Sequence, residues 1–209
     1  IPANTPFALT ATATDPDPDV LTYAWEQIDN AIATMPPTGA STNGPNFETL
    51  QPTISPTRYF PNLADLAAGV SPTWEVLPTV SRTMNFRLLV RDNAAGGGCN
   101  DHADISIDVD DGSGPFVVTD PNTTGIVWTG GTTETVTWSV AGTDAAPVSC
   151  TQVNILLSTD GGLTYTDTLA TGVPNSGSHS ITVPGINSTT VRILVQCANG
   201  LFFDISDED

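Results

Sequence analysis

The chain has 209 residues, and its 23 Asp and Glu residues against five Arg and no Lys give a formal net charge of −18 at pH 7. Proteins that bind nucleic acids use Lys and Arg to displace counterions from phosphates, so this composition excludes nucleic-acid binding. Anionic membrane surfaces would repel the chain for the same electrostatic reason. Its apolar runs are far shorter than the roughly 20 residues that cross a bilayer, so we expect no membrane insertion.

The composition also predicts a folded, extracellular β protein. Charged residues make up 13% of the chain and hydrophobic residues 39%, which favours a folded chain over an acidic disordered one. The chain has no lysine, has Asp far in excess of Glu and is rich in Thr, Gly and Pro, a composition typical both of secreted bacterial surface proteins and of proteins from saline habitats. Residues 1–7 carry no charged segment followed by an apolar one, so we interpret the chain as excised from a longer precursor.

Alternating apolar and polar residues predict strands in the first half of the chain. The alternation covers residues 7–14, 21–26, 84–91 and 105–110. Each of these stretches places apolar side chains on one face and polar ones on the other. This pattern is typical of strands in a β-sandwich, where one face of each sheet is buried.

Residues 28–82 interrupt this alternation with eight prolines. Proline cannot donate to a central ladder, so we expect mostly loop here, with one short helix at residues 63–68 that Asn62 caps and Gly69 ends. The insertion either covers one sheet, packed by its own aromatic side chains, or exposes them as a ligand surface. The aromatic residues concerned are Phe47, Tyr59, Phe60 and Trp74.

A second β unit follows a turn-rich linker at residues 110–115. Alternation restarts at residues 136–140, 153–157 and 191–195. We therefore predict an all-β fold of two tandem immunoglobulin-like (Greek-key) β-sandwiches, at residues 1–111 and 114–209, the first with the long proline-rich insertion. Because the linker is short and both units are acidic, we expect an end-to-end arrangement with a small interface.

The segment Ser158 to Tyr165 matches the Asp-box pattern found at hairpin turns of sialidase propellers. A single copy does not make a propeller, and the box is a turn remote from the active site in those proteins. Asp-Gly-Gly between alternating strands is a hairpin signal on its own. We interpret the segment as a structural turn.

Acidic residues in the first unit predict a structural calcium site. The turn Asp-Pro-Asp-Pro-Asp places three carboxylates at alternate positions, and further acids follow the strand at 84–91. Calcium takes six to eight oxygen ligands, and a divalent ion would relieve the repulsion among close carboxylates. A solvated acidic turn is the alternative interpretation, since Asp is also a common turn residue. The predicted ligands are Asp15, Asp17, Asp19, Asp92 and Asp101, with Asp104 as a further candidate.

The sequence carries no catalytic motif, so we predict that the chain is not an enzyme. A zinc protease needs His-Glu-x-x-His, and the two histidines, His102 and His179, are not followed by Glu. Neither a nucleophile elbow nor a P-loop is present. Paired carboxylates are frequent by chance in so acidic a chain, so none is assigned as a general acid.

Three cysteines remain to be placed. Cys197 ends the apolar face of one strand, and Cys150 lies just before another. In an immunoglobulin-like sandwich these would be neighbouring antiparallel strands, which predicts a Cys150–Cys197 disulfide in an extracellular setting. Cys99 would be left free or pair with a partner outside the chain.

Two motifs of the first unit resemble the polycystic-kidney-disease-type and cadherin-like repeats of bacterial surface proteins, which are Greek-key β-sandwiches. They are ATDPDPDVLTYAW at residues 13–25 and FRLLVRDN at residues 86–93. More specifically, motifs along nearly the whole chain resemble the region downstream of the catalytic domain in secreted bacterial reprolysin-like metallopeptidases. They include SPTRYFP at 55–61, WEVLP at 74–78, VTWSVAGT at 136–143 and FFDIS at 202–206.

The resemblance implies a non-catalytic extracellular module with a structural or presentation role, in a larger secreted or cell-surface bacterial protein, stabilised by calcium. Its partners would be the other domains of the parent polypeptide. Two alternatives remain open at this point. The chain could be an adhesion module that recognises polysaccharide or a surface protein, or a subunit of a polymeric surface fibre built from further copies of itself.

Overall fold

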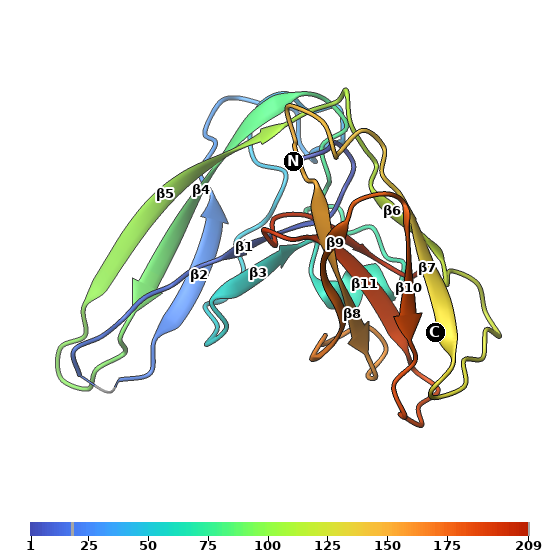
Figure 1. Cartoon of the computed structure of the whole chain (residues 1–209). Helices are drawn as coiled ribbons and strands as arrows, with labels where there is room; N and C mark the ends of the chain where they lie inside the picture. The colour runs from blue at the N-terminus through green and yellow to red at the C-terminus, as the bar shows by residue number, and fades with distance from the viewer. Residues whose placement is uncertain (18, 209) are drawn as a thin grey trace.

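The computed structural model describes residues 1–17 and 19–208 as an all-β protein in the shape of an arch (Figure 1). In this part of the chain, no helix has the length and apolar character needed to cross a membrane. The first half contains β1 (Phe7–Thr10), β2 (Thr22–Gln27), β3 (Thr57–Phe60), α1 (Leu63–Ala67), β4 (Arg82–Arg91) and β5 (Asn100–Val109). The second half contains β6 (Val117–Asp120), β7 (Thr133–Ser139), β8 (Gln152–Ser158), β9 (Asp167–Pro174), β10 (Ser178–Thr182), β11 (Arg192–Cys197) and β12 (Phe203–Ile205).

The first half forms two antiparallel sheets, β1-β3 and β2-β4-β5. Period-2 alternation sets the faces of β4, since Met84, Phe86 and Leu88 are buried and the residues between them are not. The predicted strands at 21–26, 84–91 and 105–110 correspond to β2, β4 and β5. The buried faces pack into a core in which Phe7 and Phe60 stack, with ring centroids 4.6 Å apart.

The proline-rich insertion is an ordered cover over this core. It contains the predicted helix, and the Oδ1 atom of Asn62 accepts the Asp65 N–H at 2.9 Å, as expected of an N-cap. Gly69 ends the turn at φ = +62°, a conformation that glycine adopts without a Cβ penalty. The insertion also contains β3, which the sequence analysis took for loop because prolines flank its four residues on both sides.

The second half forms two further antiparallel sheets, β10-β7-β6 and β12-β11-β8-β9. Their inner faces bury apolar side chains at alternating positions of β7 and β8, whereas β11 buries Ile193, Leu194 and Val195 in succession. Ser158 and Asp160 shape the turn after β8. The Asp160 carboxylate accepts the backbone N–H groups of Leu163 and Thr164 at 3.1 and 2.9 Å. Hydrogen bonds from the Ser158 and Thr164 hydroxyls lower the pKa of Asp160 to about 2, which fits a structural turn.

Cys150 and Cys197, the pair predicted from strand phase, are joined by a disulfide with Cα atoms 5.9 Å apart. Cys99 is free and exposed.

A disulfide across a separation of 47 residues stabilises the folded chain by about 2–4 kcal/mol, chiefly by restricting the unfolded chain. We expect the double variant Cys150→Ser/Cys197→Ser to lose this amount in urea unfolding. Mass spectrometry after alkylation should count one thiol before reduction and three after it. Three reactive thiols without reduction would contradict the bond.

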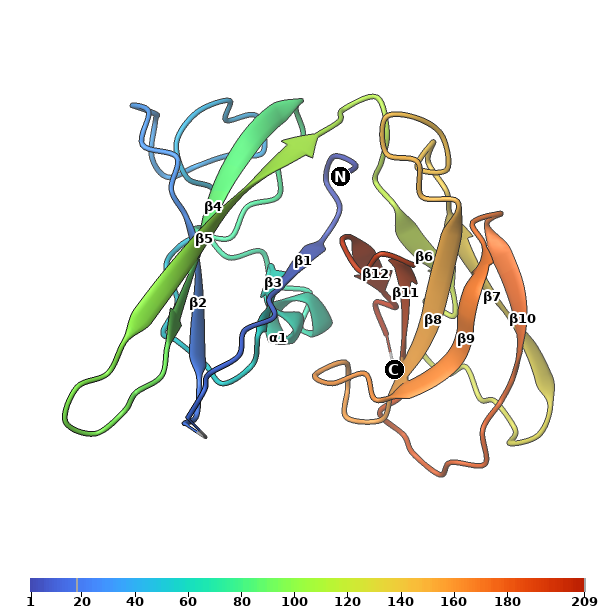
Figure 2. The same cartoon turned by 60° about the vertical axis from the view of Figure 1, so that its left-hand side comes forward.

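The two halves share a core, which differs from the predicted end-to-end arrangement with a small interface. β1 lies antiparallel to the start of β12, with the Phe203 N–H donating to Pro6 O at 3.0 Å and the Ala8 N–H to Leu201 O at 2.9 Å. Figure 2 shows α1, β1 and β3 filling the space between the outer sheets of the arch. Beside this contact lies a buried apolar cluster of Ala8, Leu63, Leu194, Phe203 and Ile205. We call the backbone contact and this cluster together the seam.

Candidate functional site

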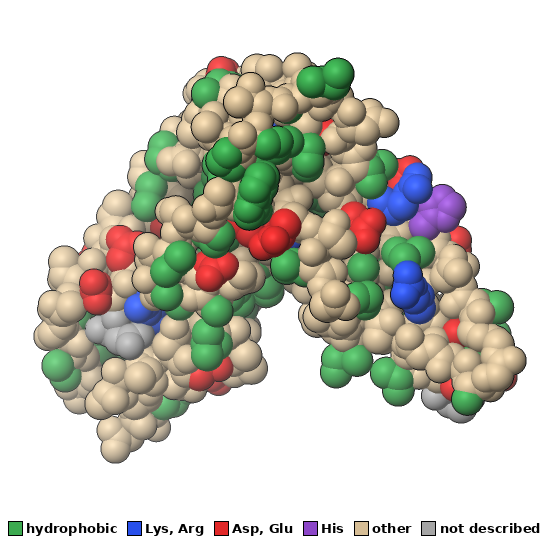
Figure 3. All heavy atoms as spheres, turned by 180° about the vertical axis from the view of Figure 1, so that it is seen from behind, with side chains coloured by type: hydrophobic (Ala, Val, Ile, Leu, Met, Phe, Trp, Pro, Cys, Tyr) green, Lys and Arg blue, Asp and Glu red, His purple; other side chains and the backbone are tan. Residues whose placement is uncertain are grey.

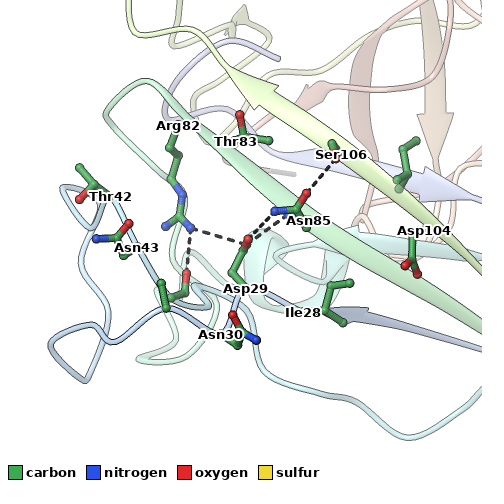
Figure 4. A pocket seen from close by; sticks show the side chains of 13 residues that line it. Ile28, Asp29, Asn30, Thr42, Asn43, Arg82, Thr83, Asn85, Asp104 and Ser106 are labelled. Atoms are coloured by element: carbon green, nitrogen blue, oxygen red, sulfur yellow. Dashed lines mark hydrogen bonds and ion pairs between the residues drawn. The ribbon is translucent and has the colours of Figure 1, made fainter.

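A polar cavity of the first half lies where the insertion meets the β4-β5 hairpin (Figure 4). Its volume is about 380 Å³. One wall is formed by residues 28–31 and 42–44 of the insertion, and the other by residues 82–85 and 104–106 of the two strands. Most of the groups on these walls are side-chain amides, hydroxyls and carboxylates.

Arg82 and Asp29 fix the shape of this cavity. The Arg82 guanidinium donates to the carbonyls of Ser41 and Gly44 at 3.0 and 2.8 Å, and lies 3.6 Å from the Asp29 carboxylate. Asp29 in turn accepts the backbone and side-chain N–H groups of Asn85 at 3.1 and 2.7 Å. The network ties the loop at 41–44 to β4, so the cavity is preformed.

The carboxylates of this cavity are held by neighbouring groups of the protein. Asp29 is held by Arg82 and Asn85, and Asp104 makes a bidentate pair with Arg87 at 2.7 and 2.8 Å. A general acid or base needs a carboxylate that can reach a substrate proton, and both carboxylates here are engaged with the protein. The amides of Asn30 and Asn43 make no hydrogen bond within the described chain, so they are open to an uncharged polar group.

A second cavity, also of about 380 Å³, brings together some of the predicted calcium ligands. Asp15, Asp92 and Asp101 line it, together with Cys99 and His102. The Asp92 carboxylate accepts the Cys99 N–H through both oxygens, at 2.9 and 2.8 Å, and also the Ala94 N–H at 3.1 Å. These backbone donors lower its pKa and close the loop between β4 and β5.

The other predicted ligands lie apart from this cavity. Asp104 is three residues from Asp101 on β5, and an odd spacing places two side chains on opposite faces of a strand. Asp104 therefore pairs with Arg87 on the outer face. Asp17 and Asp19 are exposed and do not line the cavity, and the Asp17 N–H donates to the Asp15 carboxylate at 2.8 Å. Among the described residues, no three His, Cys, Asp or Glu side chains gather as metal ligands. The predicted ligands are therefore divided between this cavity, the exposed residues Asp17 and Asp19, and the outer face of β5.

The four aromatic residues proposed as a ligand surface do not form one. Phe47 and Phe60 are 3% and 0% exposed and pack edge to face in the core. Tyr59 is half-buried against Phe203 in the seam, with ring centroids 5.4 Å apart. Trp74 is 45% exposed. Phe47 and Phe60 pack against the sheet, because burying a ring stabilises the fold more than exposing it.

Three buried ionisable groups were not predicted from the sequence. Arg58 and Glu75 form an ion pair of 2.6 Å inside the first half, with side chains 9% and 2% exposed. Asp204 lies in β12, where its carboxylate accepts the Val118 N–H at 2.7 Å. Nothing in the sequence around Arg58 and Glu75 distinguishes them from charged residues that are exposed. The one available signal for Asp204 is its place between Phe203 and Ile205 in a short apolar strand.

Asp204 should make stability depend on pH. Burial raises its pKa to about 7, although the Val118 N–H opposes the shift. The folded state therefore binds a proton that the unfolded chain releases near pH 4, so stability falls as pH rises from about 4 to about 7. We expect the difference in unfolding free energy between the native chain and Asp204→Asn to fall by about 2–3 kcal/mol across this range. Urea titrations at several pH values measure it, and a pH-independent difference would contradict it.

A search of protein-family profiles, of curated proteins and of solved structures found no match to the chain. The function is therefore argued from the residues and the geometry described above.

Proposed function

We propose that this chain is a non-catalytic structural module that holds neighbouring parts of a larger extracellular protein at a fixed spacing and angle. The observation that carries the proposal is the seam, which joins two β units through backbone hydrogen bonds and a shared apolar cluster. The finer assignment that we propose is a pair of immunoglobulin-like units of the kind found in secreted bacterial metallopeptidases. Motifs spread over the chain support it by resemblance.

The buried polar groups support the same role. Arg58 and Arg82 each hold segments of the insertion against the sheet, and Asp29 is fully engaged by its neighbours. Catalytic sites need groups that are free to exchange protons or attack a substrate, whereas these groups serve to lock loops. Loops locked in this way suit a rigid spacer.

Single-molecule energy transfer tests this rigidity. One dye is attached to Cys99 in the first half and the other to a cysteine introduced by Ser176→Cys in the second. A rigid spacer gives one narrow distribution of transfer efficiency. The control variant Thr49→Cys places both dyes in the first half and gives the width expected without any interdomain motion. A distribution much broader than this control would contradict the proposal.

Calcium stabilisation stays a prediction beside this proposal. Calcium held by Asp15, Asp92 and Asp101 would raise the melting temperature, because a ligand at 100 times its Kd adds about 2.7 kcal/mol. Asp101→Asn should then abolish the shift, whereas Asp104→Asn on the opposite face should keep it. Thermal unfolding with calcium and with a chelator measures both. An unchanged melting temperature of the native chain would contradict the prediction.

The polar cavity favours a second candidate function, the binding of a neutral, hydroxyl-rich ligand such as a saccharide. Its free amides Asn30 and Asn43 are suited to sugar hydroxyls, and its charged groups are already paired. Titration calorimetry with neutral hexasaccharides tests this candidate. Asn43→Ala should abolish any binding in this cavity, and Thr49→Ala, which lies outside it, should not.

A further inference from the structure

β5 presents a long open edge on the outer side of the arch (Figure 1). The strand order β2-β4-β5 leaves it hydrogen-bonded within its sheet to β4 alone. Its residues 100–106 are all exposed. Unpaired edges of this length are templates for another strand, and proteins usually shorten or cover them.

The N-terminus shows that this edge accepts a strand. The Ile1 amino group donates to Asp108 O at 2.6 Å, the Asp110 N–H donates to Ile1 O at 2.9 Å, and Pro2 bridges Asp110 in parallel orientation. These contacts also identify which residues turn their backbone groups outward, since N–H and C=O directions alternate along a strand. The even-numbered residues face outward, and Asn100, His102, Asp104 and Ser106 continue this series.

The side chains of β5 specify the chemistry of a strand that would lie beside them. On the inner face, Ala103 and Ile105 are exposed, and Ile105 is 43% exposed although it pairs with the buried Phe86. On the outer face lie the carboxylates of Asp108 and of Asp104, and Asp104 also pairs with Arg87. A neighbouring strand places its side chains next to these on the same two faces, so the complementary strand is apolar on one face and basic on the other.

We propose that the open edge of β5 binds an extended segment of another protein in which apolar residues alternate with Lys or Arg. The overall charge of −18 attracts such a segment. A second copy of this chain does not qualify, because copies repel each other and the chain has no lysine. Three of its arginines, Arg58, Arg82 and Arg192, are buried, and the other two lie on β4, which is paired on both sides. The proposal is independent of the structural role proposed above.

The space-filling view shows where this edge stands on the surface. Figure 3, which views the molecule from behind, shows a histidine near arginine side chains on one arm of the arch. His102 is exposed on β5. Among the outward backbone groups of the described residues 100–106, only the His102 N–H has a partner, the Asp101 carboxylate at 2.8 Å. A docking strand would displace the Asp101 carboxylate from the His102 N–H. The N–H groups of Asn100, Asp104 and Ser106 are open to the docking strand without such a displacement.

Hydrogen exchange followed by NMR tests the proposal with a capped octapeptide of alternating Lys and Val. We expect the peptide to slow exchange at Asn100, Asp104 and Ser106 by at least about tenfold at saturation, as new backbone hydrogen bonds form. A peptide with the four Lys and four Val in two blocks should bind at least about tenfold more weakly, because its faces do not match β5. Equal binding of the two peptides, or no protection of these amides, would overturn the proposal.

Matched variants at one residue separate strand addition from general charge attraction. Ser106→Pro removes one outward N–H that β4 does not use, and the ring blocks a neighbouring strand. Ser106→Ala loses the same hydroxyl contact to Asn85 and keeps the N–H. We expect the alternating peptide to bind Ser106→Pro at least about tenfold more weakly than the native chain and Ser106→Ala within about twofold. Equal affinity of the two variants for the alternating peptide would overturn the proposal. If Ser106→Pro does not fold, the comparison of the alternating and block peptides on the native chain decides it.

Discussion

Replacing Arg58 with methionine is expected to lower the free energy of unfolding by about 3–5 kcal/mol. Arg58 donates to the carboxylate of Glu75 at 2.6 Å and to Trp25 O at 2.6 Å, so it links the insertion to β2. Its guanidinium also lies 4.4 Å from the centre of the Phe60 ring. Without Arg58, Glu75 is a buried charge with no partner, which is the main part of the cost.

The loss should be smaller at low pH. Burial raises the pKa of Glu75, and Arg58 opposes this shift by its charge and hydrogen bond. In Arg58→Met that opposition is gone, so the carboxyl binds a proton at a higher pH and becomes neutral. Urea unfolding at pH 5 should therefore show a smaller difference from the native chain than at pH 8.

The double variant Arg58→Met/Glu75→Leu separates the charge from the packing. Apolar replacement of both partners of a buried pair is often neutral or stabilising, so we expect the double variant to recover most of the loss. Arg87→Met is the surface control, since its pair with Asp104 is 41% and 48% exposed and solvent screens it, so its loss should change stability little. Equal losses in Arg58→Met and Arg87→Met would contradict the assigned role.

The parts of the fold that follow from local pattern were predictable from sequence. Alternation along β4 fixed which side chains are buried, and Asn62 with Gly69 fixed the ends of the short helix. The Cys150–Cys197 pair followed from strand phase. The same rule of alternation already separated Asp101 from Asp104, because three residues is an odd spacing on a strand. Their proximity in sequence had suggested that Asp101 and Asp104 belong to one calcium site, but their side chains lie on opposite faces of β5.

The features that depend on long-range contacts were not predictable from sequence. Arg58 and Glu75 are polar residues in a proline-rich segment, and no periodicity distinguishes a buried charge from an exposed one. β3 has four residues, too few for alternation to stand out between Ser55-Pro56 and Pro61. The seam joins residues 6–8 to residues 201–203, and nothing local to either segment indicates the other. Such contacts arise only once the chain has folded.

The seam leads to the other large effect, the loss expected from Phe203→Ala. Phe203 is fully buried, packs edge to face with Tyr59 and lies in the apolar cluster that joins the two halves. Removing a buried phenyl ring costs about 3–5 kcal/mol through lost burial and the cavity left behind. Because the ring contacts both halves, we expect the variant also to weaken their coupling.

Hydrogen–deuterium exchange read by mass spectrometry reports each half separately in one denaturant titration. The native chain should open both halves at one urea concentration, whereas Phe203→Ala should open them at two. Phe86→Ala is the matched control, since Phe86 is equally buried and its ring contacts are with Phe7, Phe47 and Phe60, which all belong to the first half. Phe86→Ala should lower the free energy of unfolding by a similar amount but leave the seam intact, so the two halves should still unfold at one urea concentration. If Phe86→Ala separates the unfolding transitions of the two halves as much as Phe203→Ala does, the separation is caused by the loss of stability, and the seam is not what couples the halves.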